Sequence, residues 1–163
     1  GHWEADLVIG KKSGKDQVLL TLAERKSRQY WMLPIKDREA DSVMNAFKKL
    51  QETYSEHFSE VFKTITTDNG SEFSRLSELE ELAETLVYFT HPYTSCEKGT
   101  NERHNGIIRR FIPKGKRISD FDMDEISNIE VWCNSLPRKI LGYRTPDEVF
   151  EDELDCIYRQ HAS

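Results

Sequence analysis

Residues 3–35 read WEADLVIGKKSGKDQVLLTLAERKSRQYWMLPI, and three apolar runs follow one another within this stretch. The runs at 3–9, 17–23 and 28–35 are short and rich in β-branched, leucine or aromatic residues, which predicts three strands. A glycine- and lysine-containing segment separates the first two runs, and the polar ERKS separates the next two, so both connections suit turns. We therefore expect three antiparallel strands in succession.

After residue 35 the pattern changes to alternating helices and strands. Apolar residues recur at three- and four-residue steps over 39–54, which is the spacing of one helix face. The further elements expected are a strand at 63–67, a helix at 76–84, a strand at 86–90, a helix over 99–112 ended by Pro113, a helix at 122–135 capped by Asp122 or Asp124, and a short helix beginning at Thr145-Pro146. This order predicts an α/β fold in which helices flank a mixed sheet.

The composition is that of a globular protein. Among the 163 residues, 37% are hydrophobic and 32% are charged, and no apolar run is long enough to span a membrane. The three cysteines, Cys96, Cys133 and Cys156, lie far apart without a C-x-x-C spacing. A disulfide framework or a zinc site is therefore not expected, and the simpler location is the reducing cytoplasm. No secretory signal pattern opens the chain.

Charge is distributed unevenly along the chain. The formal net charge of -6 argues against a general nucleic-acid-binding surface. Residues 91–119 nevertheless contain only two acids and seven basic residues: Lys98, Arg103, Arg109, Arg110, Lys114, Lys116 and Arg117. This segment is a candidate phosphate-binding surface, and the alternative is a solvated helix end.

Three carboxylates occupy positions that suggest chemistry. Asp6 lies in the middle of an apolar strand, where burying an unpaired carboxylate is costly. Asp68 ends the strand at 63–67, and such strand ends are favoured places for ligand and metal contacts. Glu102 lies near the start of the helix expected over 99–112. Each has an ordinary structural alternative, respectively a solvated strand face, a turn and a solvated helix face. Taken together, their oxygens are the ligands that Mg²⁺ prefers.

Three longer blocks of sequence contain these carboxylates: HWEADLVIG (2–10), TTDNGSEF (66–73) and HPYTSCEKGTNERHNGIIRRFIPKG (91–115). Together with the closing LGYRTPDEVF (141–150), they resemble DDE transposases of the insertion-sequence-30 family. Asp6, Asp68 and Glu102 fall on the positions of that family's three catalytic carboxylates. The resemblance covers nearly the whole chain, from residue 1 to about residue 150.

The resemblance implies a ribonuclease H-like fold, shared with retroviral integrases. It also implies divalent-metal-dependent cleavage of DNA at transposon ends, followed by transfer of the freed 3′-hydroxyl to target DNA. Asp6, Asp68 and Glu102 are then expected to hold Mg²⁺ or Mn²⁺, as two ions that activate the nucleophile and stabilise the leaving oxygen. The residues expected to contact DNA are Lys98, Arg103, Arg109, Arg110, Lys114, Lys116, Asn69, Asn101 and Asn105.

The same resemblance suggests a domain organisation. Residues 1–150 are expected to form the integrase-type catalytic core and residues 151–163 a C-terminal tail, with an N-terminal DNA-binding domain absent from this chain. Because two transposon ends must be cut, the active form is expected to be a homo-oligomer. Two alternatives stay open. One is a nuclease of the same fold, and the other is a domesticated, inactive relative that serves as a DNA-binding or assembly module.

Overall fold

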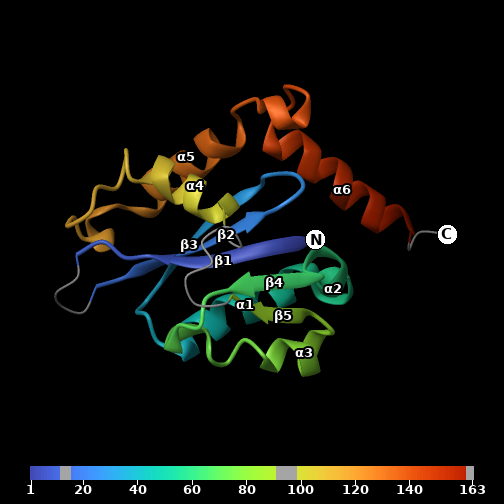
Figure 1. Ribbon diagram of the computed structural model, residues 1–163, viewed down its shortest axis with the longest axis horizontal. Helices are drawn as coiled ribbons and strands as arrows, with labels where there is room; N and C mark the ends of the chain where they lie inside the picture. The colour runs from blue at the N-terminus through green and yellow to red at the C-terminus, as the bar shows by residue number, and fades with distance from the viewer. Residues whose placement is uncertain (12–15, 91–98, 161–163) are drawn as a thin grey trace.

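The computed structural model describes residues 1–11, 16–90 and 99–160, which form one mixed sheet flanked by helices (Figure 1). The strands within this part of the chain are β1 (His2–Val8), β2 (Val18–Glu24), β3 (Tyr30–Ile35), β4 (Thr64–Thr67) and β5 (Leu86–Phe89). Their order across the sheet is β3-β2-β1-β4-β5. Strand β1 therefore lies in the centre.

The strand directions confirm the expected start of the fold. Strands β1, β2 and β3 pair antiparallel in succession, whereas β4 pairs parallel to β1 and β5 pairs parallel to β4. Every residue of β2 is buried. Burial on both faces explains why this strand is mostly apolar, with Thr21 and Glu24 as its polar residues, and does not alternate between apolar and polar residues.

The helices of the described residues are α1 (Ala40–Tyr54), α2 (Phe58–Val61), α3 (Glu78–Ala83), α4 (Gly99–Ile108), α5 (Met123–Asn134) and α6 (Pro146–Gln160). Short 3₁₀ turns occur at Ser55–His57, Ser71–Phe73, Ile118–Asp120 and Lys139–Leu141. Helices α1 and α3 lie on one side of the sheet, and α4 and α5 lie on the other (Figure 1). None of these helices is long and apolar enough to cross a membrane.

Each face of the sheet has its own apolar core. On the α1 side, side chains such as Trp3, Leu20 and Phe47 form the larger cluster. On the α4 and α5 side, Leu19 packs with Ile108 of α4 in a second cluster. Because neighbouring side chains of a strand point to opposite faces, adjacent leucines of β2 contribute to different cores.

Helix α4 is shorter than expected. It ends at Ile108, after which Arg110 N–H donates to Ile107 O and Phe111 N–H donates to Ile108 O in tighter turns. Pro113 disfavours helical backbone in the residue before it, which explains why the expected continuation to residue 112 was wrong.

Helices α5 and α6 begin as the sequence indicates, but α6 is longer. Asp122 is the residue that caps α5, and it forms a reciprocal capping box with Glu125. Helix α6 runs for 15 residues from Pro146, so the expectation of a short helix was wrong. Leu154 and Ile157 follow Phe150 at helical spacing and pack against the larger core, which sustains the helix beyond residue 150.

Candidate active site

The first carboxylate, Asp6, lies on the central strand. It pairs with Thr21 across the antiparallel β1–β2 ladder. Its neighbours Ala5 and Leu7 pack into the larger core on the α1 side, so Asp6 faces the α4 side together with Glu4. Asp6 is half-buried, which leaves part of the residue accessible from solvent.

Strand pairing relates the positions of Asp68 and Asp6. In the parallel pair of β1 and β4, the printed register ends where Glu4 lies opposite Thr66. Asp6 follows two residues later on β1, and Asp68 follows two residues later, just past the end of β4 at Thr67, so the two carboxylates are expected near the same end of this strand pair. The chain then turns, and Gly70 N–H donates to Asp68 Oδ1 at 3.0 Å. A Cβ at position 70 would lie 2.7 Å from the Glu72 carboxylate and 2.9 Å from Asp68 Oδ1, so glycine leaves room for both side chains.

Two asparagines fasten helix α4 to strand β1. The backbone N–H of Asn101 donates to Glu4 Oε2 at 2.8 Å, and its Nδ2 donates to Glu4 O at 3.1 Å. One turn later, Asn105 Nδ2 donates to Asp6 Oδ2 at 2.7 Å. Position 102 lies between these two contacts on the helix. The backbone therefore carries Glu102 alongside the Asp6 strand, although its side chain lies outside the described part of the structure.

A buried tyrosine fixes the orientation of the Asn105 amide. Tyr30 OH donates to Asn105 Oδ1 at 2.8 Å. Burial raises the pKa of Tyr30 well above its ordinary value, so the hydroxyl stays protonated and remains a donor. The amide oxygen must then face Tyr30 and the amide nitrogen must face Asp6. Asn105 is consequently a positioning residue for the Asp6 carboxylate.

Arg109 brings positive charge to the end of β1. Its Nη2 donates to Ile9 O at 2.9 Å, whereas its buried Nη1 has no hydrogen-bond partner among the described residues. Burial lowers the pKa of Arg109, and Asp6 lies near enough to oppose that shift. A guanidinium remains charged despite such a shift, so a cation lies beside the candidate site.

The basic loop after α4 is held against the same end of β1. A Cβ on Gly10 would lie 2.2 Å from Lys116 O, so only glycine permits this close approach of the two backbones. Gly115 N–H donates to Gly10 O at 3.3 Å. Lys114 and Lys116 are exposed on this loop and lie at the strand end that follows Asp6.

The expected DNA contacts differ in their accessibility. Among the described residues, the exposed members of the set are Arg103, Arg110, Lys114, Lys116 and Asn69. Asn69 also donates from Nδ2 to Thr90 O at 3.1 Å. Asn101 is fully buried and its Nδ2 donates to Glu4 O and Thr21 O, so its side chain has no exposed surface in this structure. Asn105 turns its amide toward Asp6, and Lys98 lies outside the described residues.

The fit of this site to a metal rests on its donor atoms. Asp6 and Asp68 supply carboxylate oxygens from adjacent strands, and hard divalent cations prefer such ligands. Asn105 and Gly70 each hold one carboxylate oxygen, which restricts the orientation of both side chains. Among the described residues, which exclude the Glu102 side chain, no group of three metal-ligating side chains is found. Asp6 and Asp68 thus follow corresponding positions of two paired strands, and Glu102 lies on the helix that Asn105 joins to Asp6; all three remain expected ligands.

The sequence did not reveal the buried polar groups that support the site. Glu4 is 2% exposed, although its alternation with Asp6 suggested a solvated strand face. Arg25 Nε contacts Glu4 Oε1 at 2.9 Å, and this ion pair together with the Asn101 N–H satisfies the buried carboxylate. The sequence offered one sign of this ion pair, the basic residue Arg25 in the β2–β3 turn. Its contact with Glu4, however, depends on the register of the β1–β2 hairpin.

Comparison with known sequences identifies relatives of this chain. A family model for the integrase core domain matches residues 1–95. The probable transposase for insertion-like sequence element IS1161 of Streptococcus salivarius is 38% identical over 93% of this chain. The transposase for insertion sequence element IS4351 of Bacteroides fragilis is 38% identical over 95% of this chain. The chain spans 42% and 46% of the lengths of these two relatives.

Solved structures confirm the fold class. The catalytic core domain of BIV integrase superposes with a TM-score of 0.68 at 19% identity, over 96% of this chain and 97% of that chain. The HTLV-2 integrase catalytic core domain, solved in complex with magnesium in a trimeric form, gives a TM-score of 0.63 at 17% identity, over 90% of this chain and 93% of that chain. The mixed sheet is thus the expected ribonuclease H-like fold. With its family match over residues 1–95, the chain belongs to the integrase core domain family.

Proposed function

We propose that this chain is the catalytic domain of a transposase that cleaves DNA at transposon ends and joins the freed 3′-hydroxyl to target DNA. The proposal is supported by the parallel pairing of β1 with β4, which runs to Glu4 and Thr66, two residues before Asp6 and Asp68, and by the bond from Asn105 of α4 to Asp6. The names of the transposase relatives support it, although the chain spans less than half of each of the two described above.

Asp6, Asp68 and Glu102 are the proposed ligands of two divalent cations, either Mg²⁺ or Mn²⁺. Such ions, when bound, stabilise charge on the attacking and leaving oxygens of an in-line displacement at phosphorus. The protein itself supplies alignment. Asn105 holds the Asp6 carboxylate, and the turn at Gly70 holds that of Asp68.

The basic residues near the site are proposed to bind the DNA phosphates. Arg109, whose guanidinium contacts the end of β1 and interacts with the charge of Asp6, is one candidate contact, and Lys114 and Lys116 extend the positive charge along the loop. Arg103 and Arg110 are also exposed. A second copy of the chain is the expected partner, because two transposon ends must be processed together.

The proposed catalytic core is residues 1–150, and α6 continues from it to Gln160. The remaining length of the transposase relatives is the proposed place for recognition of specific DNA sequences, which would explain a core domain with a net charge of -6.

A strand-joining assay tests this function. An oligonucleotide duplex with a free 3′-hydroxyl is incubated with supercoiled plasmid and Mn²⁺, and joined products are quantified. We expect metal-dependent joining by the wild type, and a loss of at least about 100-fold in Asp68→Asn because a proposed carboxylate ligand of the metal site is neutralised. Asp120→Asn changes an exposed aspartate elsewhere and should keep full activity.

The products distinguish the alternatives. Plasmid nicking without joining would instead indicate a nuclease of the same fold. DNA binding with neither reaction in the presence of Mn²⁺ would indicate an assembly module. Either result would contradict the proposed transposase activity.

A further inference from the structure

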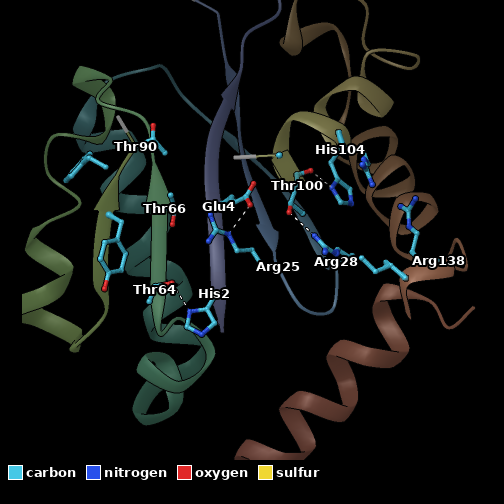
Figure 2. Close-up of a pocket in the computed structure, with 15 residues that line it drawn as sticks. His2, Glu4, Arg25, Arg28, Thr64, Thr66, Thr90, Thr100, His104 and Arg138 are labelled. Atoms are coloured by element: carbon cyan, nitrogen blue, oxygen red, sulfur yellow. Dashed lines mark hydrogen bonds and ion pairs between the residues drawn. The ribbon is translucent and has the colours of Figure 1, made fainter. Parts of the chain in front are cut away.

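A pocket of about 960 Å³ opens over strands β1 and β4 (Figure 2). His2 and Glu4 of β1 and Thr64 and Thr66 of β4 line one part of it. Glu4 and Thr66 each lie two residues before one of the site carboxylates on the same strand face. The pocket therefore begins one side-chain step from the carboxylates and extends away from them along β1 and β4.

Arginine dominates the charge of this pocket. Its lining includes Arg25, Arg28, Arg103 and Arg138, whereas Glu4 is the one carboxylate among the described residues that line it. Arg25 pairs with Glu4. The other three come from the β2–β3 turn, α4 and the segment after α5, and none of them has a carboxylate partner among the described residues. An acidic protein thus concentrates unpaired positive charge at one place, and such charge attracts phosphate.

Hydrogen bonds hold the guanidinium groups of Arg28 and Arg138 in the wall of the pocket next to α4. Arg28 Nη1 donates to Thr100 Oγ1 at 2.8 Å, and Arg138 Nη2 donates to Cys133 O at 2.9 Å. Both guanidinium groups are therefore fixed before any ligand arrives.

Two buried nitrogens in this wall, Arg138 Nε and His104 Nε2, have no hydrogen-bond partner among the described residues. His104 is only 4% exposed, and its Nδ1 donates to Thr100 O at 2.8 Å. Burial lowers the pKa of His104, so this wall carries a neutral imidazole next to the arginines.

The opposite wall presents an aromatic ring. Tyr88 of β5 lies opposite Thr66 in the parallel register, so both side chains point to the pocket face. Tyr88 is 52% exposed, and Phe89 beside it also lines the pocket. Exposed aromatic rings facing a row of arginines are typical of proteins that bind single-stranded nucleic acid, since the rings stack on bases and the cations follow the phosphates.

We propose that this pocket binds the unpaired nucleotides that continue the DNA strand beyond the scissile phosphate. Arg28, Arg103 and Arg138 contact successive phosphates, and Tyr88 stacks on a base. Bases inside a duplex are stacked on one another, so contact with Tyr88 requires unpaired nucleotides. The inference rests on the proposed function, because DNA next to the carboxylates is what places such a strand in the pocket.

Binding is tested without catalysis by fluorescence anisotropy in the absence of divalent metal. Three labelled duplexes are compared: blunt, with a single-stranded thymidine extension, and with an abasic extension of equal length. The wild type should bind the thymidine-extended duplex about tenfold more tightly than the blunt one, with the abasic duplex between them. Removing two cations by Arg28→Ala with Arg103→Ala should abolish the preference and lower the slope of log affinity against log salt by roughly 1.4.

A charge-matched control separates the pocket from general electrostatics. Lys48→Ala with Lys49→Ala removes two exposed cations from α1, on the other side of the sheet, and should keep the preference. Arg103 is exposed and has no ion pair in the described structure, so Arg103→Ala alone should fold. This single variant should weaken the preference for the extended duplex, and it replaces the double variant if that protein does not fold.

Equal affinity of the wild type for blunt and extended duplexes would overturn the proposal, as would an equal loss of preference in both double variants. Asp68→Asn leaves the arginines and Tyr88 unchanged and should keep the preference. Absence of strand joining by a wild type that retains this preference would therefore contradict the proposed function and leave the pocket standing.

Discussion

Asn105 has little freedom, because both ends of its amide are bonded. Its oxygen accepts from the hydroxyl of Tyr30 at 2.8 Å and its nitrogen donates to Asp6 at 2.7 Å. The Tyr30 ring is itself stacked on His104, with centroids 4.7 Å apart and an interplanar angle of 8°. A chain of buried polar contacts thus leads from α4 and β3 to a single carboxylate oxygen, which fixes its direction before a ligand binds.

Replacing Asn105 by alanine should weaken the site more than it weakens the fold. The Tyr30 hydroxyl loses its strongest acceptor, so we expect a loss of about 1–3 kcal/mol in the free energy of unfolding. The Asp6 carboxylate loses its donor, and we expect Mn²⁺ affinity to fall by roughly 10- to 100-fold. Urea unfolding and calorimetric titration measure the two effects.

Asn45→Ala is the matched control for this prediction, because Asn45 is exposed on α1 on the other side of the sheet. It should change neither quantity measurably. Unchanged Mn²⁺ affinity in a folded Asn105→Ala protein would show that this amide does not position Asp6.

Side chains of helix α5 cover the outer edge of the sheet, which is formed by strand β3. Strand β3 has no strand partner on its outer side within the described sheet. Tyr30 N–H donates to Asn134 Oδ1 at 3.0 Å, Asn134 Nδ2 donates to Tyr30 O at 2.8 Å, and Met32 N–H donates to Glu130 Oε2 at 2.6 Å. These bonds satisfy backbone N–H and C=O groups that could otherwise pair with a strand of another chain.

Glu130 should make stability depend on pH. Burial raises the pKa of Glu130 from 4.5 to about 7. The folded state then holds the proton more tightly than the unfolded state, so the stabilisation is fully present below pH 4.5 and is lost as the pH rises through 7. The effect is on the order of 3 kcal/mol.

Glu130→Gln keeps an acceptor for Met32 N–H and cannot ionise. The variant should therefore be more stable than the wild type at pH 8, and the difference in stability between pH 5 and pH 8 should shrink. Urea unfolding at both pH values checks this, with the exposed Glu151→Gln as control. An unchanged pH profile would mean that Glu130 titrates normally.

Local sequence patterns predicted the elements well and their mutual contacts poorly. The three consecutive strands and α1 follow from apolar spacing, and the cap at Asp122 follows from short-range hydrogen bonding. The four-residue helix α2 was not predicted, because it is too short to show a helical period of apolar residues. The edge contacts of Glu130 and Asn134 escaped because they join residues about 100 positions apart.

For the candidate site as well, individual residues could be picked out from the sequence, but their contacts could not. Asp6 and Asp68 stand out from the sequence because Asp6 interrupts an apolar strand and Asp68 directly follows a strand, and the strands that precede them, β1 and β4, do pair in parallel. The burial of Glu4 and Asn101 could not be predicted, since it depends on how α4 lies on β1. The arginine pocket, lined by Arg25, Arg28, Arg103 and Arg138, is formed by segments far apart in the sequence, and no local sequence pattern connects them.

On the scale of the whole molecule, one sheet separates a structural side from a functional side. The larger core and its aromatic cluster lie on the α1 side, whereas the carboxylates, the arginine pocket and α4 lie on the other. Helix α6 closes the aromatic cluster, because Phe150 meets Trp3 and Trp31 edge-on at 5.7 and 5.4 Å between ring centroids. Changes on the structural side should therefore affect stability and leave metal binding alone.

Phe150→Ala tests this division. The residue is 7% exposed, so its truncation should lower the free energy of unfolding by about 3 kcal/mol or more through lost burial and a cavity. Mn²⁺ affinity of the folded fraction should stay within about twofold of the wild type. Tyr158→Ala removes a ring that is 43% exposed from the same helix and should cost less stability. A large fall in metal affinity of folded Phe150→Ala would show that the two sides are coupled.

The shared carboxylate site is tested most directly by calorimetric titration of Mn²⁺ into the wild type, Asp6→Asn, Asp68→Asn and Glu102→Gln. Each ligand belongs to one site, so removal of any one should weaken binding by about tenfold or more while circular dichroism shows an intact fold. Equal Mn²⁺ binding by all four proteins would contradict the account, because the ions would then be held somewhere other than between β1, β4 and α4.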